Sequence, residues 1–186
     1  MIEEKSKLYC LEAVTDAGKD RLKLLPLLEH LAMEHDIPNV YQSCDDIATF
    51  EQSLNDLLYE DKDFKTYEVI YLVVEGAENH IQIRGYTYSL EEIAELFEGK
   101  LSKKIVHFRN SKTLDIDIET AQYFLDVTGA KALSGYTEES NFDSSFLDSK
   151  LFGYYYNDTD DVAELVKMLL ENYNAACQAL GFRLFY

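Results

Sequence analysis

Two apolar runs constrain the fold of this chain more than any other feature of its sequence. The first, "YEVIYLVV", spans residues 67–74, and the second, "KIVHF", spans residues 104–108. Nearly continuous apolar runs of this length are typical of strands that other elements cover on both faces, as in a parallel sheet. The first run ends at Glu75 and Gly76, and the second ends at the polar segment 109–111. We therefore expect both runs to be central strands of a parallel sheet.

Further strand patterns alternate with helical patterns along the whole chain. Strands are expected at residues 7–14, 39–43, 67–74, 104–108, 130–136 and 182–186, with a shorter one at 79–85. Helices are expected around residues 24–31, 49–58, 89–99, 117–128, 142–156 and 159–180. This alternation predicts an α/β fold, a three-layer sandwich with a mostly parallel central sheet flanked by helices.

Several residues have the spacing of helix caps. Thr49 and Gln52 fit a capping box at the start of one helix, and either Asp158 or Thr159 is expected to cap the longest helix. That helix should bury one apolar stripe against the sheet. The stripe consists of Val162, Leu165, Val166, Leu169, Leu170, Tyr173, Ala176, Cys177 and Leu180.

Length and charge limit the possible partners and compartment. The 186 residues are 47% hydrophobic and no linker-like stretch divides them, so we expect a single domain over residues 1–186. There are 17 basic and 35 acidic residues, and the net charge of −18 would repel nucleic acid and anionic membranes. The first residues do not resemble a signal peptide and no run is long enough to span a bilayer. We therefore expect a cytoplasmic protein with no nucleic-acid or membrane partner.

Motifs for cofactors and metals are missing from the sequence. It has no glycine-rich phosphate-binding loop and no G-x-S-x-G elbow. Cys10, Cys44 and Cys177 lack the C-x-x-C spacing of redox or zinc sites, so we expect buried thiols. No cofactor and no metal site is predicted.

The ends of the two central runs are the place to look for a functional site. Ligands of open α/β sheets bind beyond the carboxyl ends of the strands. Glu75 and Gly76 follow the first run there, and Arg109, Asn110 and Ser111 follow the second. A strand that ends by presenting one hydroxyl raises the question of whether Ser111 is a nucleophile.

Six segments of the chain carry a resemblance to a known fold family. The segments "LYCLEA", "LLPLLEHL", "VIYLVVEG", "SLEEIAELFEGK", "KIVHFRNSKTL" and "TGAKALSGYT" resemble, in order and spacing, an uncharacterised bacterial branch of the caspase-like proteins, the clan CD cysteine peptidase fold. The resemblance covers most of the chain and implies one caspase-like domain. It also implies that one central strand ends in His-Gly and the next in a Gly-Ser-Cys loop, where histidine and cysteine form the catalytic dyad.

This chain departs from that pattern at both dyad positions. Glu75 stands where the resemblance implies the histidine, ahead of a retained Gly76, and the segment 109–111 replaces Gly-Ser-Cys, with Ser111 at the cysteine position. A solvated carboxylate with a pKa of about 4.3 is a poor base for a serine hydroxyl. His107 lies inside the second strand, so we expect it to be a hydrogen-bonded histidine of the covered sheet. No catalytic residue is therefore expected.

The resemblance with a degenerate dyad suggests a catalytically inactive caspase-like domain, a pseudo-peptidase that binds a protein or a basic peptide. The expected binding residues are Glu75, Gly76, His80, Arg109, Asn110 and Ser111. Arg109 is expected to fill the mouth of the cleft and to form an ion pair with Glu75 across neighbouring strands. Two alternatives stay open. One is an atypical hydrolase that uses Ser111 with Glu75 or His80, and the other is a scaffolding or oligomerising protein.

Overall fold

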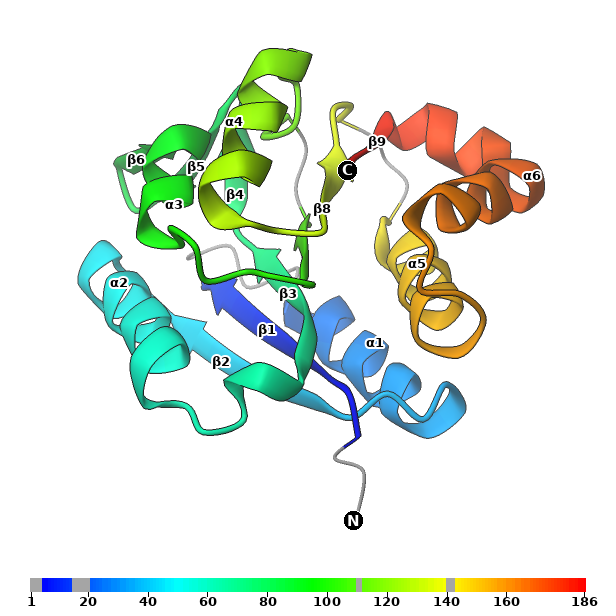
Figure 1. Cartoon of the computed structure of the whole chain (residues 1–186), viewed down its shortest axis with the longest axis horizontal. Helices are drawn as coiled ribbons and strands as arrows, with labels where there is room; N and C mark the ends of the chain where they lie inside the picture. Colours follow the sequence, from blue (N-terminus) through cyan, green and yellow to red (C-terminus); the bar gives the residue numbers. More distant parts are fainter. Residues whose placement is uncertain (1–4, 15–20, 110–111, 140–142) are drawn as a thin grey trace.

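The computed structural model describes residues 5–14, 21–109, 112–139 and 143–186, which form three layers around a central sheet (Figure 1). The sheet has six strands in the order β2-β1-β3-β7-β8-β9. These strands are β1 (Lys7–Ala13), β2 (Asn39–Cys44), β3 (Tyr67–Val73), β7 (Ile105–Phe108), β8 (Ala132–Tyr136) and β9 (Phe182–Phe185). All neighbours are parallel except β8 and β9, which are antiparallel. The expected α/β fold with a mostly parallel sheet is confirmed.

The two apolar runs lie side by side at the centre of this sheet, as expected. β3 and β7 are parallel neighbours, with Leu72 opposite Phe108. Alternate residues of each strand point to opposite faces, and both faces are buried because helices cover them. The carboxyl ends of the two strands therefore meet at the same edge.

Six helices of the described residues cover the two faces. They are α1 (Arg21–Glu34), α2 (Ile47–Asn55), α3 (Leu90–Leu96), α4 (Ile118–Thr128), α5 (Ser145–Asn157) and α6 (Val162–Leu180). Helices α2, α3 and α4 pack on one face, and α1, α5 and α6 pack on the other (Figure 1). None of the described helices is long and apolar enough to cross a membrane.

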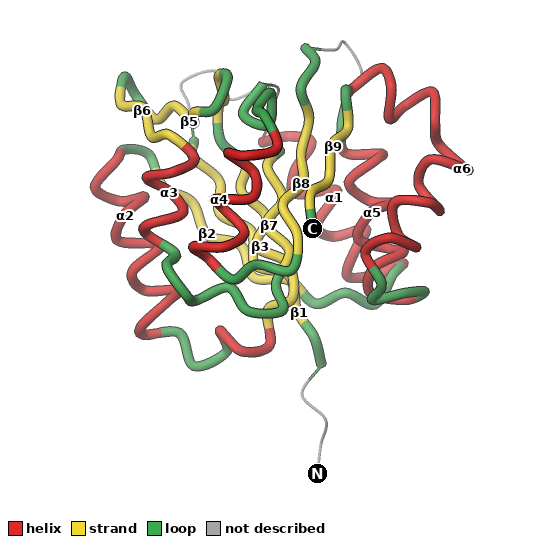
Figure 2. Tube along the Cα trace, turned by 45° about the horizontal axis from the view of Figure 1, so that its top comes forward, coloured by secondary structure: helices red, strands yellow, loops and turns green. Residues whose placement is uncertain are grey.

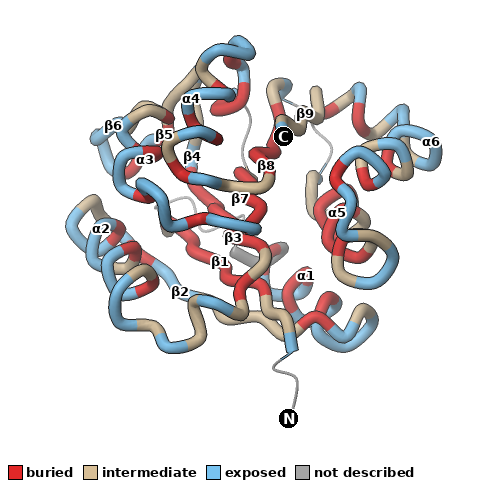
Figure 3. Tube along the Cα trace, in the orientation of Figure 1, coloured by how far each residue is buried: buried red, intermediate tan, exposed pale blue. Residues whose placement is uncertain are grey.

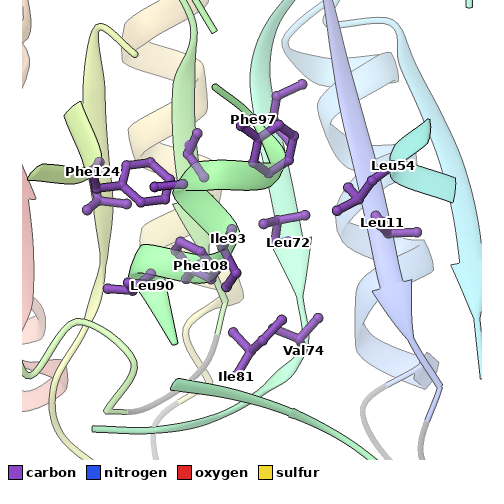
Figure 4. Packing of buried hydrophobic residues seen from close by; sticks show 14 of the residues in the cluster. Leu11, Leu54, Leu72, Val74, Ile81, Leu90, Ile93, Phe97, Phe108 and Phe124 are labelled. Atoms are coloured by element: carbon purple, nitrogen blue, oxygen red, sulfur yellow. The ribbon is translucent and has the colours of Figure 1, made fainter. Parts of the chain in front are cut away.

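Each face has its own apolar core. On the first, Leu72 and Phe108 of the sheet pack with Ile93 of α3 and Phe124 of α4 (Figure 4). Burying side chains of this size contributes roughly 1.5 to 3 kcal/mol each. Figure 3 shows the same arrangement along the chain, with buried positions concentrated in the central strands and exposed ones on the outer sides of the helices.

Two helix caps differ from the sequence prediction. Asp46, not Thr49, caps α2, because its carboxylate accepts a hydrogen bond from the amide of Thr49. The Thr49 hydroxyl accepts one from the amide of Asp46 in return and completes the capping box. Asp161 caps α6 in place of Asp158 or Thr159. The latter two end α5, since both of their amides donate to the carbonyl of Tyr154.

The apolar stripe of α6 is only partly buried. Val162, Leu165, Leu169, Cys177 and Leu180 lie in the core of the second face. The prediction was wrong for Leu170, which is 44% exposed. The helix has a non-helical residue at Tyr173, and Leu170 lines an open pocket beside β9.

A small antiparallel sheet follows β3. It consists of β4 (Glu75–Ala77), β5 (His80–Ile83) and β6 (Tyr86–Ser89). The short strand expected at residues 79–85 is its middle strand. Figure 2 shows β5 and β6 at the end of the molecule opposite the amino terminus, which is the carboxyl edge of the main sheet.

Candidate functional site

The carboxyl edge of β3 and β7 is the candidate site. The amide of Arg109 donates to the carbonyl of Leu72 at 2.9 Å, which holds the ends of the two strands together. Beyond this point β3 continues through Val74 into β4, while the chain after β7 enters residues 110–111. Two of the predicted binding residues, Asn110 and Ser111, lie outside the described residues.

Glu75 and Gly76 belong to β4, in the small sheet. Glu75 is exposed and pairs in register with Gln82, while Gly76 pairs with Ile81. Glu75 forms no ion pair with any other residue that the structure describes. The residue is therefore exposed at the surface of the small sheet.

His80 is tied to the chain that follows β7. The hydroxyl of Thr113 donates to the carbonyl of His80 at 2.9 Å, and the Nδ1 atom of the His80 ring lies 2.8 Å from the carbonyl of Glu78. Thr113 is fully buried, so this contact fixes the small sheet against the loop after β7. The structure thus brings His80 close to Thr113, in the loop that follows β7.

Arg109 does not pair with Glu75, and that prediction was wrong. Its guanidinium turns toward α5, where Nη2 lies 3.2 Å from a carboxylate oxygen of Asp143 and 2.5 Å from the hydroxyl of Ser145. The side chain is only 9% exposed. A guanidinium that loses water needs partners on its own face of the sheet, and α5 supplies them there. Arg109 therefore does not fill the mouth beside Glu75.

Below Arg109 lies a group of fully buried polar side chains that we call the buried polar cluster. It consists of Tyr71, His107, Ser134, Tyr136 and Asp148. Register places the first three on adjacent strands, with Tyr71 opposite His107 and His107 opposite Ser134. All three point to the same face of the sheet, where α5 presents Asp148.

Asp148 is the acceptor at the centre of the cluster. Nε2 of His107 lies 2.8 Å from Oδ1, and the hydroxyl of Tyr71 donates to Oδ2 at 2.5 Å. The hydroxyl of Tyr136 also donates to Oδ1, and Nε of Arg109 lies 4.0 Å from Oδ2. On the other side of the imidazole, Nδ1 of His107 is 2.7 Å from the hydroxyl of Ser134. The prediction that His107 is a hydrogen-bonded histidine of the covered sheet is confirmed.

The cluster shifts the pKa of its members. Burial alone would raise the pKa of Asp148, but the charge and hydrogen bond of His107, together with Arg109, hold it below its ordinary value. Burial and the neighbouring Asp148 raise the pKa values of Tyr71 and Tyr136 well above 10. The arrangement is therefore a carboxylate that is held ionised by neutral hydroxyls and two basic side chains.

Comparison with protein families matches residues 5–186 to a "Family of unknown function (DUF6642)". The match covers nearly the whole chain. The chain belongs to the DUF6642 family. A search of curated proteins found no match.

In this DUF6642 protein, Ser134, His107 and Asp148 have the residue types of a hydrolase triad. All three are fully buried, and both ring nitrogens of His107 are occupied within the cluster. A nucleophile must reach a substrate, and a base must reach the proton that it removes. The trio therefore binds α5 to the sheet and is not placed for catalysis.

The thiols of this DUF6642 protein are also buried. Cys44 ends β2, and burial together with Asp45 raises its pKa to about 12. Burial and Glu12 raise the pKa of Cys10 as well. Because the thiolate is the reactive form, neither cysteine is activated as a nucleophile. Among the described residues, no group of histidine, cysteine and acidic side chains could hold a metal ion.

Sequence reasoning missed four members of the cluster, namely Tyr71, Ser134, Tyr136 and Asp148. One signal for Asp148 was present. Leu151, Phe152 and Tyr155 follow it by three, four and seven residues, which places the aspartate on the apolar face of its helix. A carboxylate on such a face requires buried donors, and that requirement would have indicated a polar partner on the sheet.

The carboxyl edge also carries a series of exposed carboxylates, which we call the acidic rim. It consists of Asp45, Glu75, Glu78 and Glu138, which lie in or directly after β2, β4 and β8. None of them forms an ion pair with another residue in the described ranges. The basic side chain nearest the end of β7, Arg109, is turned inward toward α5. Lys112 at this edge forms an ion pair with Glu139, which follows Glu138 directly. The edge thus presents exposed carboxylates that form no ion pair within the described ranges.

Proposed function

We propose that this chain is a catalytically inactive caspase-like domain whose acidic rim binds a basic segment of a partner protein. One observation carries the proposal. Glu75, at the position where the resemblance implies a catalytic histidine, is an exposed carboxylate, while His107 of the neighbouring strand is buried with both ring nitrogens occupied. Neither central strand therefore directs an accessible imidazole at the carboxyl edge.

The fold supports the caspase-like part of this proposal. The resemblance implies two adjacent central strands whose ends meet, and β3 and β7 are adjacent and parallel at the centre of the sheet. The segment that the resemblance aligns with the histidine position leads into β4, directly beyond β3. These features agree with the expected position of Glu75 beyond the first central strand, while Ser111 lies outside the described residues.

Charge supports the choice of partner. The carboxylates of the acidic rim follow different strands but face the same edge, so their potentials add along it. A lysine- or arginine-rich segment would gain electrostatic attraction there without displacing an internal cation. Such attraction between exposed charges weakens as salt screens it.

A labelled peptide rich in lysine, arginine and glycine tests this proposal by fluorescence anisotropy. The Glu75→Gln, Glu78→Gln double variant should bind roughly fivefold more weakly at low salt, with a smaller salt dependence. The control is Glu29→Gln, Glu34→Gln on α1, which removes the same charge from exposed positions on another face. Equal weakening by both double variants would mean that only net charge matters and would overturn the proposal.

A hydrolase that uses Ser111 with Glu75 or His80 is the second candidate. The contact between Thr113 and His80 supports it, because Thr113 follows Ser111 by two positions in the sequence. A fluorophosphonate probe reacts with activated serines and separates the two functions. Labelling that disappears in Ser111→Ala and persists in Ser145→Ala would favour the hydrolase, and no labelling of the unmodified protein would exclude it.

A further inference from the structure

The last strand, β9, forms one edge of the main sheet. It pairs with β8 on one side, and the described residues place no strand on its other side. The edge strand at the opposite end, β2, carries the exposed polar residues Gln42 and Ser43, which discourage pairing with another chain. β9 has the sequence Phe-Arg-Leu-Phe and lacks this protection.

A groove of about 490 Å³ runs along β9. Its walls are mostly apolar and come from both layers of helices, with Ile118 and Leu125 beside the polar Gln122 on the α4 side and Val166 and Leu170 on the α6 side. Ile118 is 72% exposed and Leu170 is 44% exposed. The exposed part of the α6 stripe is thus one wall of a groove whose floor is an edge strand.

The side chains of β9 alternate between the two walls. Phe182 and Leu184 pack with the core beneath α6, while Phe185 packs with the core beneath α4. Arg183 is already engaged, because Nη1 donates to the carbonyls of Leu114 and Ile116. A strand added to β9 would place its own side chains alternately against the α4 wall and the α6 wall.

Charge distinguishes the possible occupants of this groove. On α4, Glu119 and Asp126 are exposed, Asp117 caps the helix, and the helix contains no basic residue. A second copy would pair β9 with β9 about a twofold axis perpendicular to the sheet, which brings the acidic α4 helices together. Each copy also has a net charge of −18. Repulsion between like charges therefore opposes binding of a second copy, and attraction to the acidic chain favours a basic partner.

We infer that β9 accepts an extended segment of a partner protein as an additional strand, with apolar side chains at alternate positions and lysine or arginine at its ends. Main-chain hydrogen bonds to β9 would supply affinity, and the two apolar walls would select the side chains. Of the acidic rim, Glu138 adjoins this surface, because its amide donates to the carbonyl of Leu180 just before β9. Glu75 and Glu78 lie in or after β4 of the small sheet, so the inference does not depend on the function proposed above.

The probe is a labelled peptide of about ten residues in which valine or leucine alternates with threonine between lysine pairs. Binding to the full chain is measured by fluorescence anisotropy. A peptide N-methylated on alternate residues, which lacks half of the main-chain donors, and a peptide with glutamate in place of lysine should both bind roughly tenfold more weakly or worse.

Matched variants locate the binding site. Ile118→Gln and Leu170→Gln should each weaken binding severalfold, whereas Met33→Gln and Leu25→Gln on α1 should not. These controls match in exposure, because Met33 is 73% exposed and Leu25 is 47% exposed. All four positions are at the surface, so circular dichroism should show unchanged folding.

Three results would overturn the inference. The first is equal binding of the N-methylated peptide, and the second is binding that the Glu75→Gln, Glu78→Gln variant abolishes but the groove variants leave intact. The third is a dimer in analytical ultracentrifugation that Ile118→Gln or Leu170→Gln dissociates, since the groove would then hold a second copy.

Discussion

Nε2 of His107 on β7 lies 2.8 Å from Oδ1 of Asp148 on α5, and both side chains are fully buried. The contact joins a central strand to a helix that begins more than thirty-five residues later in the chain. Tyr71 and Tyr136 donate to the same carboxylate, so three strands and one helix meet at Asp148. The stability of the fold at the buried polar cluster therefore depends on Asp148.

Replacing Asp148 by asparagine should destabilise the fold by about 3 to 5 kcal/mol, because His107 and the two tyrosines lose their common anionic acceptor inside the protein. Urea unfolding followed by circular dichroism measures the change. Asp158→Asn, at an exposed position at the end of the same helix, is the control and should leave the unfolding midpoint unchanged. A loss below about 1 kcal/mol in Asp148→Asn would show that the carboxylate is not central to the cluster.

Acid should weaken the fold through the same residue. The pKa of Asp148 is lower in the folded state than its ordinary value, so the unfolded state takes up its proton first as pH falls. The stabilisation is present above the ordinary carboxyl pKa of about 3.9 and is lost as pH falls from there through the folded value. The difference in unfolding free energy between the unmodified protein and Asp148→Asn should therefore shrink below about pH 4. A difference that stays constant down to pH 2 would contradict this.

Alkali should weaken the fold through the tyrosines. Folding raises the pKa values of Tyr71 and Tyr136, so above about pH 10 the unfolded state loses these protons while the folded state keeps them. Stability should fall with rising pH there, by up to about 1.4 kcal/mol per pH unit for each tyrosine. Tyr136→Phe should show a shallower decline than the unmodified protein between pH 10 and 12. An identical slope would mean that Tyr136 ionises equally in both states.

Two adjacent leucines of α6 should respond differently to truncation. Leu169 is fully buried, so Leu169→Ala removes burial and leaves a cavity, at about 2 to 5 kcal/mol. Leu170 is 44% exposed in the groove beside β9, and Leu170→Ala should cost less than about 1 kcal/mol. Chemical denaturation of both variants tests the orientation of the helix. Equal losses would place both side chains in the core.

Two glycines with positive φ provide another matched pair. Gly181 (φ +60°) and Gly99 (φ +65°) would both strain an alanine by about 1 to 2 kcal/mol. A Cβ at Gly99 meets nothing within 4 Å, whereas one at Gly181 would lie 2.1 Å from Oγ1 of Thr137 and 2.8 Å from Cγ of Glu138. Thermal unfolding should therefore show a larger loss for Gly181→Ala than for Gly99→Ala. The reverse order would mean that the turn before β9 adjusts readily.

The sequence by itself determined the layers of this protein. Two apolar runs at residues 67–74 and 104–108 predicted the central strands, and the alternation with helical patterns predicted the parallel sheet and both covering layers. Such patterns are local, because an apolar run or a helical period is recognised within a short stretch of neighbouring residues. For the same reason the position of Glu75 at the end of a strand could be predicted.

Only the tertiary structure decided where the polar side chains point. The direction of Arg109 depends on Asp143 and Ser145, more than thirty residues away in sequence, and the partners of His107 come from β8 and α5. Leu170 fits the apolar stripe of its helix but extends past the edge of the sheet, where no core remains to cover it. Desolvation and hydrogen bonding act between groups that meet only after folding. Spacing along the chain therefore does not indicate which polar groups become partners.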